Sequence, residues 1–209
     1  MIDPFVKPPS GKPYADVPGF PPSGPVSLVD CAAGAAEIEL EIGFGRGRFA
    51  LERARGNPAA LVIGVETRRK YVHTAAELAA KHGLMNVVFR YGDARELVAR
   101  FTPDACLAHV FINFPDPWWK ARHAKRAVVT PALVGEVARL LRPGGELFVQ
   151  TDVAARAEAF HQILEGEGRL APSSGDGFVN ENRYNAVSNR EHRCVDVGGP
   201  VFRLRYLKI

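Results

Sequence analysis

The chain lacks the marks of several protein classes. Its three cysteines are an odd number without CxxC spacing, which argues against a disulfide framework and a zinc site. No run approaches 18 consecutive apolar residues, and residues 1–16 hold no apolar core of a signal peptide. The histidines lack the HExxH spacing of zinc hydrolases. We therefore predict no metal, and we expect a cytoplasmic protein that is not associated with a membrane.

The composition predicts one globular domain with an extension. Hydrophobic residues make up 46% of the 209 residues and charged residues 24%, which is close to the globular average and argues against disorder or a coiled coil. Eight of the 16 prolines fall within residues 1–36, and this density interrupts helices and central strands. We predict an irregular, proline-rich N-terminal extension over 1–36 and a single folded domain over 37–209.

From residue 37 onward, short apolar runs alternate with helical patterns. This alternation is typical of an α/β fold with a mostly parallel sheet and helices on both faces. The predicted parallel strands are 37–42, 60–66, 86–93, 106–114 and 145–152. The terminal run 200–209 alternates apolar and polar residues, which predicts a half-buried antiparallel strand at the edge of the sheet.

A glycine-rich loop follows the first predicted strand. Glu41 precedes Gly43, Gly45 and Gly47, and glycines at these positions allow a ligand to approach the backbone closely before a helix begins. The dinucleotide fingerprint GxGxxG needs a glycine where this chain has Arg48. GxGxG preceded by an acid instead resembles class I S-adenosylmethionine-dependent methyltransferases. We predict a nucleotide-like cofactor at this loop.

Two further acids lie at the carboxyl ends of the next two predicted strands. Glu66 lies about 20 residues beyond the loop, where a carboxylate can accept hydrogen bonds from both ribose hydroxyls. Asp93 ends the third strand, at the position where the class I methyltransferases that the loop resembles usually contact the adenine amino group. Because the carboxyl ends of parallel strands meet at one edge of the sheet, we expect Glu41, Glu66 and Asp93 to converge on one ligand.

The segment after the fourth strand carries the most specific motif. Two prolines hold Asp116 in a rigid turn, and the segment from Asp116 to Thr130 carries a local excess of three positive charges. The segment resembles the tRNA (guanine-N7)-methyltransferase family, whose signature is Asn-Phe-Pro-Asp-Pro-Trp-x-Lys followed by Arg-His-x-Lys-Arg. The matching residues are Asn113, Phe114, Pro115, Asp116, Pro117, Trp118, Lys120, Arg122, His123, Lys125 and Arg126. The resemblance continues through Thr151 and Asp152 to a Thr-x-x-Glu element that here has Ser188 and Glu191.

The resemblance implies a fold, a reaction and residue roles. The fold would be the Rossmann-like class I methyltransferase fold, a seven-stranded and mostly parallel sheet with an antiparallel C-terminal strand. The reaction would be methyl transfer from S-adenosylmethionine to N7 of a guanosine in the tRNA variable loop, conventionally position 46. The implied cofactor residues are Glu41, Gly43, Gly45, Gly47, Glu66, Asp93 and Asp116, and Asp116 is also the implied catalytic residue. The implied substrate or RNA residues are Lys120, Arg122, His123, Lys125, Arg126, Asp152, Ser188, Asn189, Arg190 and Glu191.

Three other functions compete with this one. An amino-group methyltransferase acting on adenine N6 or cytosine N4 also carries a proline and aromatic motif after this strand, but here Asp116 separates the prolines and a basic cluster follows. An NAD-dependent oxidoreductase is disfavoured by Arg48 and by the lack of an evident catalytic Tyr/Lys or Ser/His pair. A non-catalytic RNA-binding protein is the third. We predict tRNA as the partner, no obligatory protein subunit, and a monomer or a homodimer.

Overall fold

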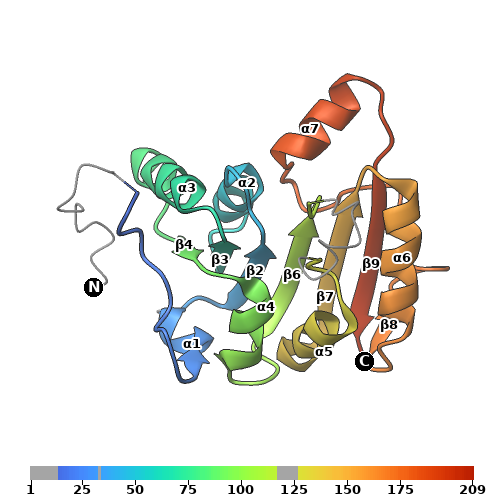
Figure 1. Ribbon diagram of the computed structural model, residues 1–209, viewed down its shortest axis with the longest axis horizontal. Helices are drawn as coiled ribbons and strands as arrows, with labels where there is room; N and C mark the ends of the chain where they lie inside the picture. The colour runs from blue at the N-terminus through green and yellow to red at the C-terminus, as the bar shows by residue number, and fades with distance from the viewer. Residues whose placement is uncertain (1–13, 33, 117–126) are drawn as a thin grey trace.

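The computed structural model describes residues 14–32, 34–116 and 127–209 (Figure 1). Its centre is a seven-stranded sheet in the order β4-β3-β2-β6-β7-β9-β8, in which β9 runs antiparallel to both its neighbours. The strands are β2 (Glu37–Ile42), β3 (Ala60–Glu66), β4 (Val87–Tyr91), β6 (Leu107–Asn113), β7 (Leu141–Thr151), β8 (Leu170–Pro172) and β9 (Phe202–Lys208). The predicted fold class, a mostly parallel seven-stranded sheet with an antiparallel C-terminal strand, is confirmed.

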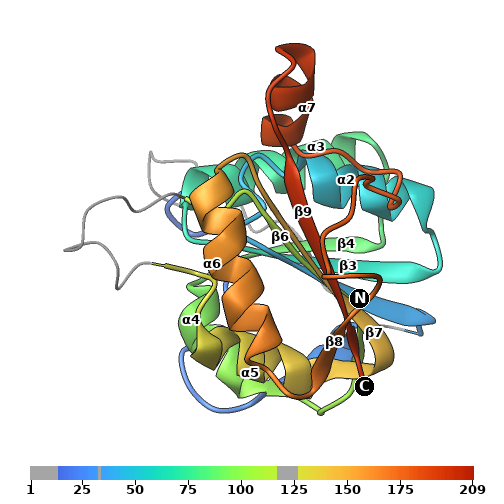
Figure 2. The same cartoon turned by 90° about the vertical axis from the view of Figure 1, so that its right-hand side faces the viewer.

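Helices cover both faces of this sheet. On one face lie α4 (Ala94–Leu97), α5 (Pro131–Leu140) and α6 (Ala154–Glu165), whose apolar side chains share a core with those of the sheet. On the other face, α2 (Arg48–Gly56) and α3 (Arg69–Lys81) pack side by side (Figures 1 and 2). In β3, Leu61 and Ile63 face the first core and Val62 faces the second. β3 and β6 are nearly continuous apolar runs because both faces of the sheet are buried, whereas β2 alternates glutamates with apolar residues.

The register of the parallel strands brings their carboxyl ends to one edge. Ile42 of β2 lies opposite both Val65 of β3 and Ile112 of β6, and Asn113 lies opposite Gln150 of β7. The loops after these four strands therefore begin side by side. This edge is where an open α/β sheet binds its ligands.

The C-terminal strand differs from the prediction. β9 is not at the edge of the sheet, because β8 pairs with it on the outer side. β8 has only three residues and ends in Pro172, so it shows no alternation by which it could be recognised in the sequence. The prediction that the terminal run lies at the edge of the sheet was therefore wrong. The edge is taken by β8, which is too short to be recognised from its own sequence and is held by pairing with β9.

Five further short elements lie in the described part of the chain. In the proline-rich segment, β1 (Val26–Ser27) pairs with β5 (Phe101–Thr102), and α1 (Leu28–Cys31) follows it. Between α4 and β5 runs the short 3-10 helix η1 (Val98–Arg100). In the polar stretch after β8, α7 (Asn189–Asp196) projects from the body of the fold in both views (Figures 1 and 2). No helix in the described ranges has the length and apolar character needed to cross a membrane.

Candidate active site

A cavity of about 680 Å³ opens at the carboxyl edge of the sheet. It is lined by residues that follow β2, β3, β4, β6 and β7, and by the start of α7. The predicted cofactor residues that line it are Glu41, Gly43, Gly45, Glu66, Asp93 and Asp116. The predicted substrate residues that line it are Asp152, Ser188, Asn189 and Arg190. Segments up to about 150 residues apart in the chain thus meet around one space.

The three glycines of the loop have two different roles. All three adopt positive φ, and a Cβ on Gly43 or Gly45 would have no atom within 4 Å. A Cβ on Gly47 would instead lie 2.7 Å from the Cβ of Ala75 on α3. Gly43 and Gly45 therefore leave the backbone open to a ligand, while Gly47 permits close packing of α2 against α3.

Glu66 ties the end of β3 to the glycine loop. Its carboxylate is 8% exposed, and Oε2 accepts a hydrogen bond of 3.0 Å from the backbone N–H of Gly45. Oε1 accepts from the backbone N–H of Arg68 at 2.9 Å and from the hydroxyl of Thr67 at 3.1 Å. A carboxylate oxygen can accept two hydrogen bonds, so Oε2 retains a position for a ligand hydroxyl.

Glu41 has a buried carboxylate oxygen that lacks a partner. Oε1 accepts a hydrogen bond of 2.9 Å from Nδ2 of Asn113, whereas Oε2 has no hydrogen-bond partner among the described residues. Burial raises the pKa of Glu41 to about 7, and the hydrogen bond from Asn113 opposes that rise. A buried polar atom without a partner is costly, so this oxygen fits a ligand that brings a cationic or donor group to the cavity.

A chain of buried hydrogen bonds runs from Glu41 to α7. Oδ1 of Asn113 accepts from Nε2 of Gln150 at 2.8 Å, and the same amide donates to Oε2 of Glu191 at 3.2 Å. Arg203 of β9 donates to Oε1 of Glu191 at 2.9 Å. Glu191 is 2% exposed and does not line the cavity. Its carboxylate lies in the interior, where it anchors the first turn of α7 to the sheet.

Ser188 caps the same helix. Its Oγ accepts a hydrogen bond of 3.1 Å from the backbone N–H of Glu191. This is the N-cap geometry that serines favour, and it accounts for the hydroxyl in the Ser-x-x-Glu element. Asn189 and Arg190 follow the cap and are placed at the rim of the cavity.

Asp116 and Asp152 each meet an arginine from another element. Nη2 of Arg68 donates to Oδ2 of Asp116 at 3.1 Å, and both side chains are more than half exposed. Arg190 of α7 donates to Oδ2 of Asp152 through Nε at 2.9 Å and also through Nη2. Ion pairs near the surface contribute only about 1 kcal/mol or less. Asp116, whose pair with Arg68 is exposed, can therefore exchange its arginine for a polar group of a substrate.

Asp93 is engaged at the start of α4. Its Oδ1 accepts from the backbone N–H of Arg95 at 3.0 Å, and its carboxylate pairs with the guanidinium of the same arginine. These hydrogen bonds from Arg95 lower the pKa of Asp93, so it is ionised near neutral pH. The predicted basic segment, with Lys120, Arg122, His123, Lys125 and Arg126, lies outside the described residues.

Sequence reasoning did not assign Asn113, Gln150 or Arg203 to the site. Asn113 and Gln150 lie near the carboxyl ends of β6 and β7, and each is a polar residue at the end of an apolar run. That position is a signal that could have identified them, because a buried amide needs hydrogen-bond partners. Arg203 lies in an alternating strand, where nothing in the sequence marks it.

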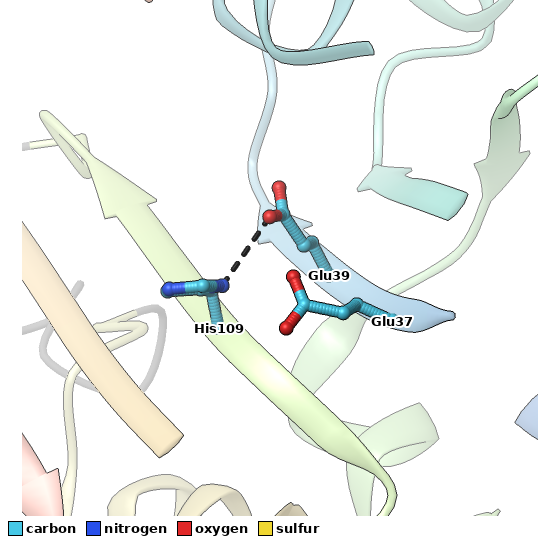
Figure 3. A group of neighbouring side chains, drawn as sticks. All are labelled: Glu37, Glu39 and His109. Atoms are coloured by element: carbon cyan, nitrogen blue, oxygen red, sulfur yellow. Dashed lines mark ion pairs between the residues drawn. The ribbon is translucent and has the colours of Figure 1, made fainter. Parts of the chain in front are cut away.

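The amino half of the sheet contains a group with donor atoms close enough to suggest a metal site. Carboxylate oxygens of Glu37 and Glu39 and a ring nitrogen of His109 lie within 4.8 Å of one another (Figure 3). However, Arg53 donates to Oε2 of Glu39 at 2.9 Å and to Oε1 at 2.5 Å, and Arg142 donates to Glu37 at 2.5 Å. The guanidinium groups already neutralise these carboxylates, so the group is a cluster of ion pairs.

Comparison with known proteins assigns the family. Residues 35–204 match the family described as "Putative methyltransferase". The tRNA (guanine-N(7)-)-methyltransferase of Myxococcus xanthus is 41% identical over 172 residues, which cover 82% of this chain and 83% of that protein. The enzyme of the same name from Anaeromyxobacter dehalogenans is 40% identical, over 82% of this chain and 85% of that protein. The chain belongs to the tRNA (guanine-N(7)-)-methyltransferase family.

Solved structures agree on the fold. A methyltransferase from Aquifex aeolicus, described as SAM dependent, superposes with a TM-score of 0.57 at 14% identity, over 87% of each chain. The geranyl diphosphate C-methyltransferase of Streptomyces coelicolor, solved with S-adenosyl-L-homocysteine, gives a TM-score of 0.55 at 14% identity, over 85% of this chain and 74% of that one. The predicted family and the predicted methyltransferase fold are both confirmed.

Proposed function

We propose that this protein transfers the methyl group of S-adenosylmethionine to N7 of a guanosine in tRNA. The observation that carries the proposal is the 40–41% identity to enzymes of that name over about four fifths of the chain, combined with a cavity at the carboxyl edge of the sheet. We place the target guanosine in the variable loop. The amino-group alternative is not favoured, because these relatives are named for guanine N7.

The residues around the cavity fit the cofactor. Glu66 would accept hydrogen bonds from the ribose hydroxyls, and the open backbone at Gly43 and Gly45 would allow close approach. The free Oε2 of Glu41 would accept a hydrogen bond from the cationic amino group of the methionine part. Asp93 would accept a hydrogen bond from the adenine amino group while it keeps its ion pair with Arg95. When bound, the cofactor supplies an electrophilic methyl group on a sulfonium.

The chemistry at guanine requires positioning more than proton transfer. N7 carries an in-plane lone pair, so no proton has to leave before the methyl group is attacked. The protein has to hold N7 in line with the breaking carbon–sulfur bond. Asp116 is placed at the cavity and can exchange Arg68 for the guanine N1–H and amino group. Its negative charge would also stabilise the positive charge that moves onto the purine.

The test is methyl transfer from labelled cofactor to unmodified tRNA transcripts, followed by nucleoside digestion and mass spectrometry. We expect N7-methylguanosine, and no product from a matched transcript made with 7-deazaguanosine, which lacks the N7 atom. A methylated adenosine or cytidine would refute the proposal.

We also propose an organisation for the working enzyme. Residues 37–209 form the catalytic domain, and the protein acts in the cytoplasm as a monomer or homodimer without a second subunit. Full transfer by the purified chain alone supports this. Activity that appears only after a cell extract is added would contradict it.

A further inference from the structure

A second cavity, of about 710 Å³, lies beside the candidate active site. It is formed by the outer surfaces of α2 and α3 and reaches the start of α7. Four residues line both cavities, namely Arg46, Arg68, Tyr71 and Asn189. The two spaces therefore form one continuous surface that leads away from the glycine loop. We call the second cavity the α2–α3 groove.

The α2–α3 groove is strongly cationic. Its charged lining comprises five cationic side chains and one carboxylate, which gives a formal charge of +4 with histidine neutral. These side chains are Arg46, Arg48, Arg55, Arg68, Lys70 and Glu52. Arg48 pairs with Glu52 at 2.8 Å, and Arg68 pairs with Asp116 at 3.1 Å. The positive charge of this small area equals the net charge of the whole chain.

The floor of the groove is apolar. Leu51 and Leu78 lie in it with the ring of Tyr71, between the two helices that carry the cationic rim. Arg46, Arg55 and Lys70 are exposed at that rim. Cationic side chains around an apolar and aromatic floor fit a nucleic acid strand, since the phosphates meet the rim and a sugar or base covers the floor. A small anion would use the rim alone.

We propose that the α2–α3 groove binds the sugar–phosphate backbone of the substrate RNA next to the methylated guanosine. The inference rests on the proposed function, because it places a strand that enters the neighbouring cavity. The continuity of the two surfaces supports it, since an RNA strand whose base occupies the active site has to leave along an adjoining surface. It assigns RNA contacts to α2 and α3, separate from the basic segment after β6.

The test compares two double variants that remove the same charge. Arg55→Ala with Lys70→Ala removes two cations from the groove. Arg142→Ala with Lys208→Ala removes two cations at the opposite end of the sheet, where β7 begins and β9 ends. For each variant we would measure the tRNA Kd over a range of salt concentrations, the KM for tRNA, kcat, and the Kd for S-adenosylmethionine.

We expect the groove variant to raise the KM and Kd for tRNA several-fold and to leave kcat and cofactor affinity unchanged. Each lost phosphate contact lowers the slope of log affinity against log salt by about 1, so we expect a change of about 2. The distal variant should keep the wild-type slope. Equal losses in both variants, or a groove variant that weakens only the cofactor, would overturn the inference. Because tRNA binding is measured directly, this test is independent of which nucleoside is methylated.

Discussion

The buried carboxyl group of Glu41 predicts a pH dependence that can be measured in two ways. Its pKa is about 7 in the folded protein, against an ordinary value of 4.5. Between these two values the folded chain holds a proton that the unfolded chain has released. The free energy of unfolding of the unliganded protein should therefore fall as pH rises from 4.5 to 7. At about 1.4 kcal/mol per pH unit, the loss is about 3 kcal/mol.

The cofactor should show the opposite dependence. A cationic amino group at Oε2 favours the ionised form of Glu41, so affinity for S-adenosylmethionine should rise with pH and level off above 7. Roughly one molecule in ten has this carboxyl ionised at pH 6, and about nine in ten at pH 8. If only the ionised form binds the cofactor, the Kd for S-adenosylmethionine should be about tenfold higher at pH 6 than at pH 8.

Isothermal titration calorimetry at several pH values measures this effect directly. Glu41→Gln keeps an oxygen that can accept from Asn113 but cannot ionise, so its weaker cofactor binding should be independent of pH across this range. Glu158→Gln, on an exposed face of α6, serves as a matched control and should retain the wild-type profile. Equal Kd values at pH 6 and pH 8 in the wild type, or the same pH profile in Glu41→Gln, would refute the reasoning.

Three further predictions follow from the site. Asp116→Asn should keep the fold and much of the cofactor affinity but lower the rate of transfer, and unchanged single-turnover kinetics would contradict its assigned role. Gln150→Met leaves Oδ1 of Asn113 and Oε2 of Glu191 without this donor, so it should lower the free energy of unfolding by about 1–3 kcal/mol in urea titration, while Gln162→Met on an exposed face of α6 should not. Gly47→Ala combines a φ of +79° with a contact of 2.7 Å, so in the same assay it should cost more than Gly144→Ala, which has a φ of +74° in open space.

Much of the fold and the position of the site could be predicted from the sequence. The alternation of apolar runs and helical patterns predicted the parallel sheet, because parallel strands joined by helices are buried on both faces and are rich in apolar residues. The acids Glu41, Glu66 and Asp93 were expected at one ligand because parallel strands end at a common edge. The structure places all three around the 680 Å³ cavity. Their contacts with the cofactor remain predictions.

The surroundings of these residues could not be predicted in the same way. Glu191 was expected to face the guanosine. Its carboxylate instead lies in the interior, where it accepts hydrogen bonds from Gln150, Asn182 and Arg203. β8 has too few residues, and α7 too few apolar positions, to show a hydrophobic period in the sequence. Contacts with neighbouring segments stabilise both elements, and the sequence pattern does not reveal those contacts.

The sequence by itself determined the five parallel strands with the helices between them, the glycine loop and the acids at the ends of the strands. These are local patterns, and each residue in a run contributes to the same structural signal. Only the tertiary structure decided which arginine meets Asp116, where Glu191 lies, and that α2 and α3 join their cations in one groove. These facts depend on contacts between segments far apart in the chain, and no local pattern records which distant segments will meet.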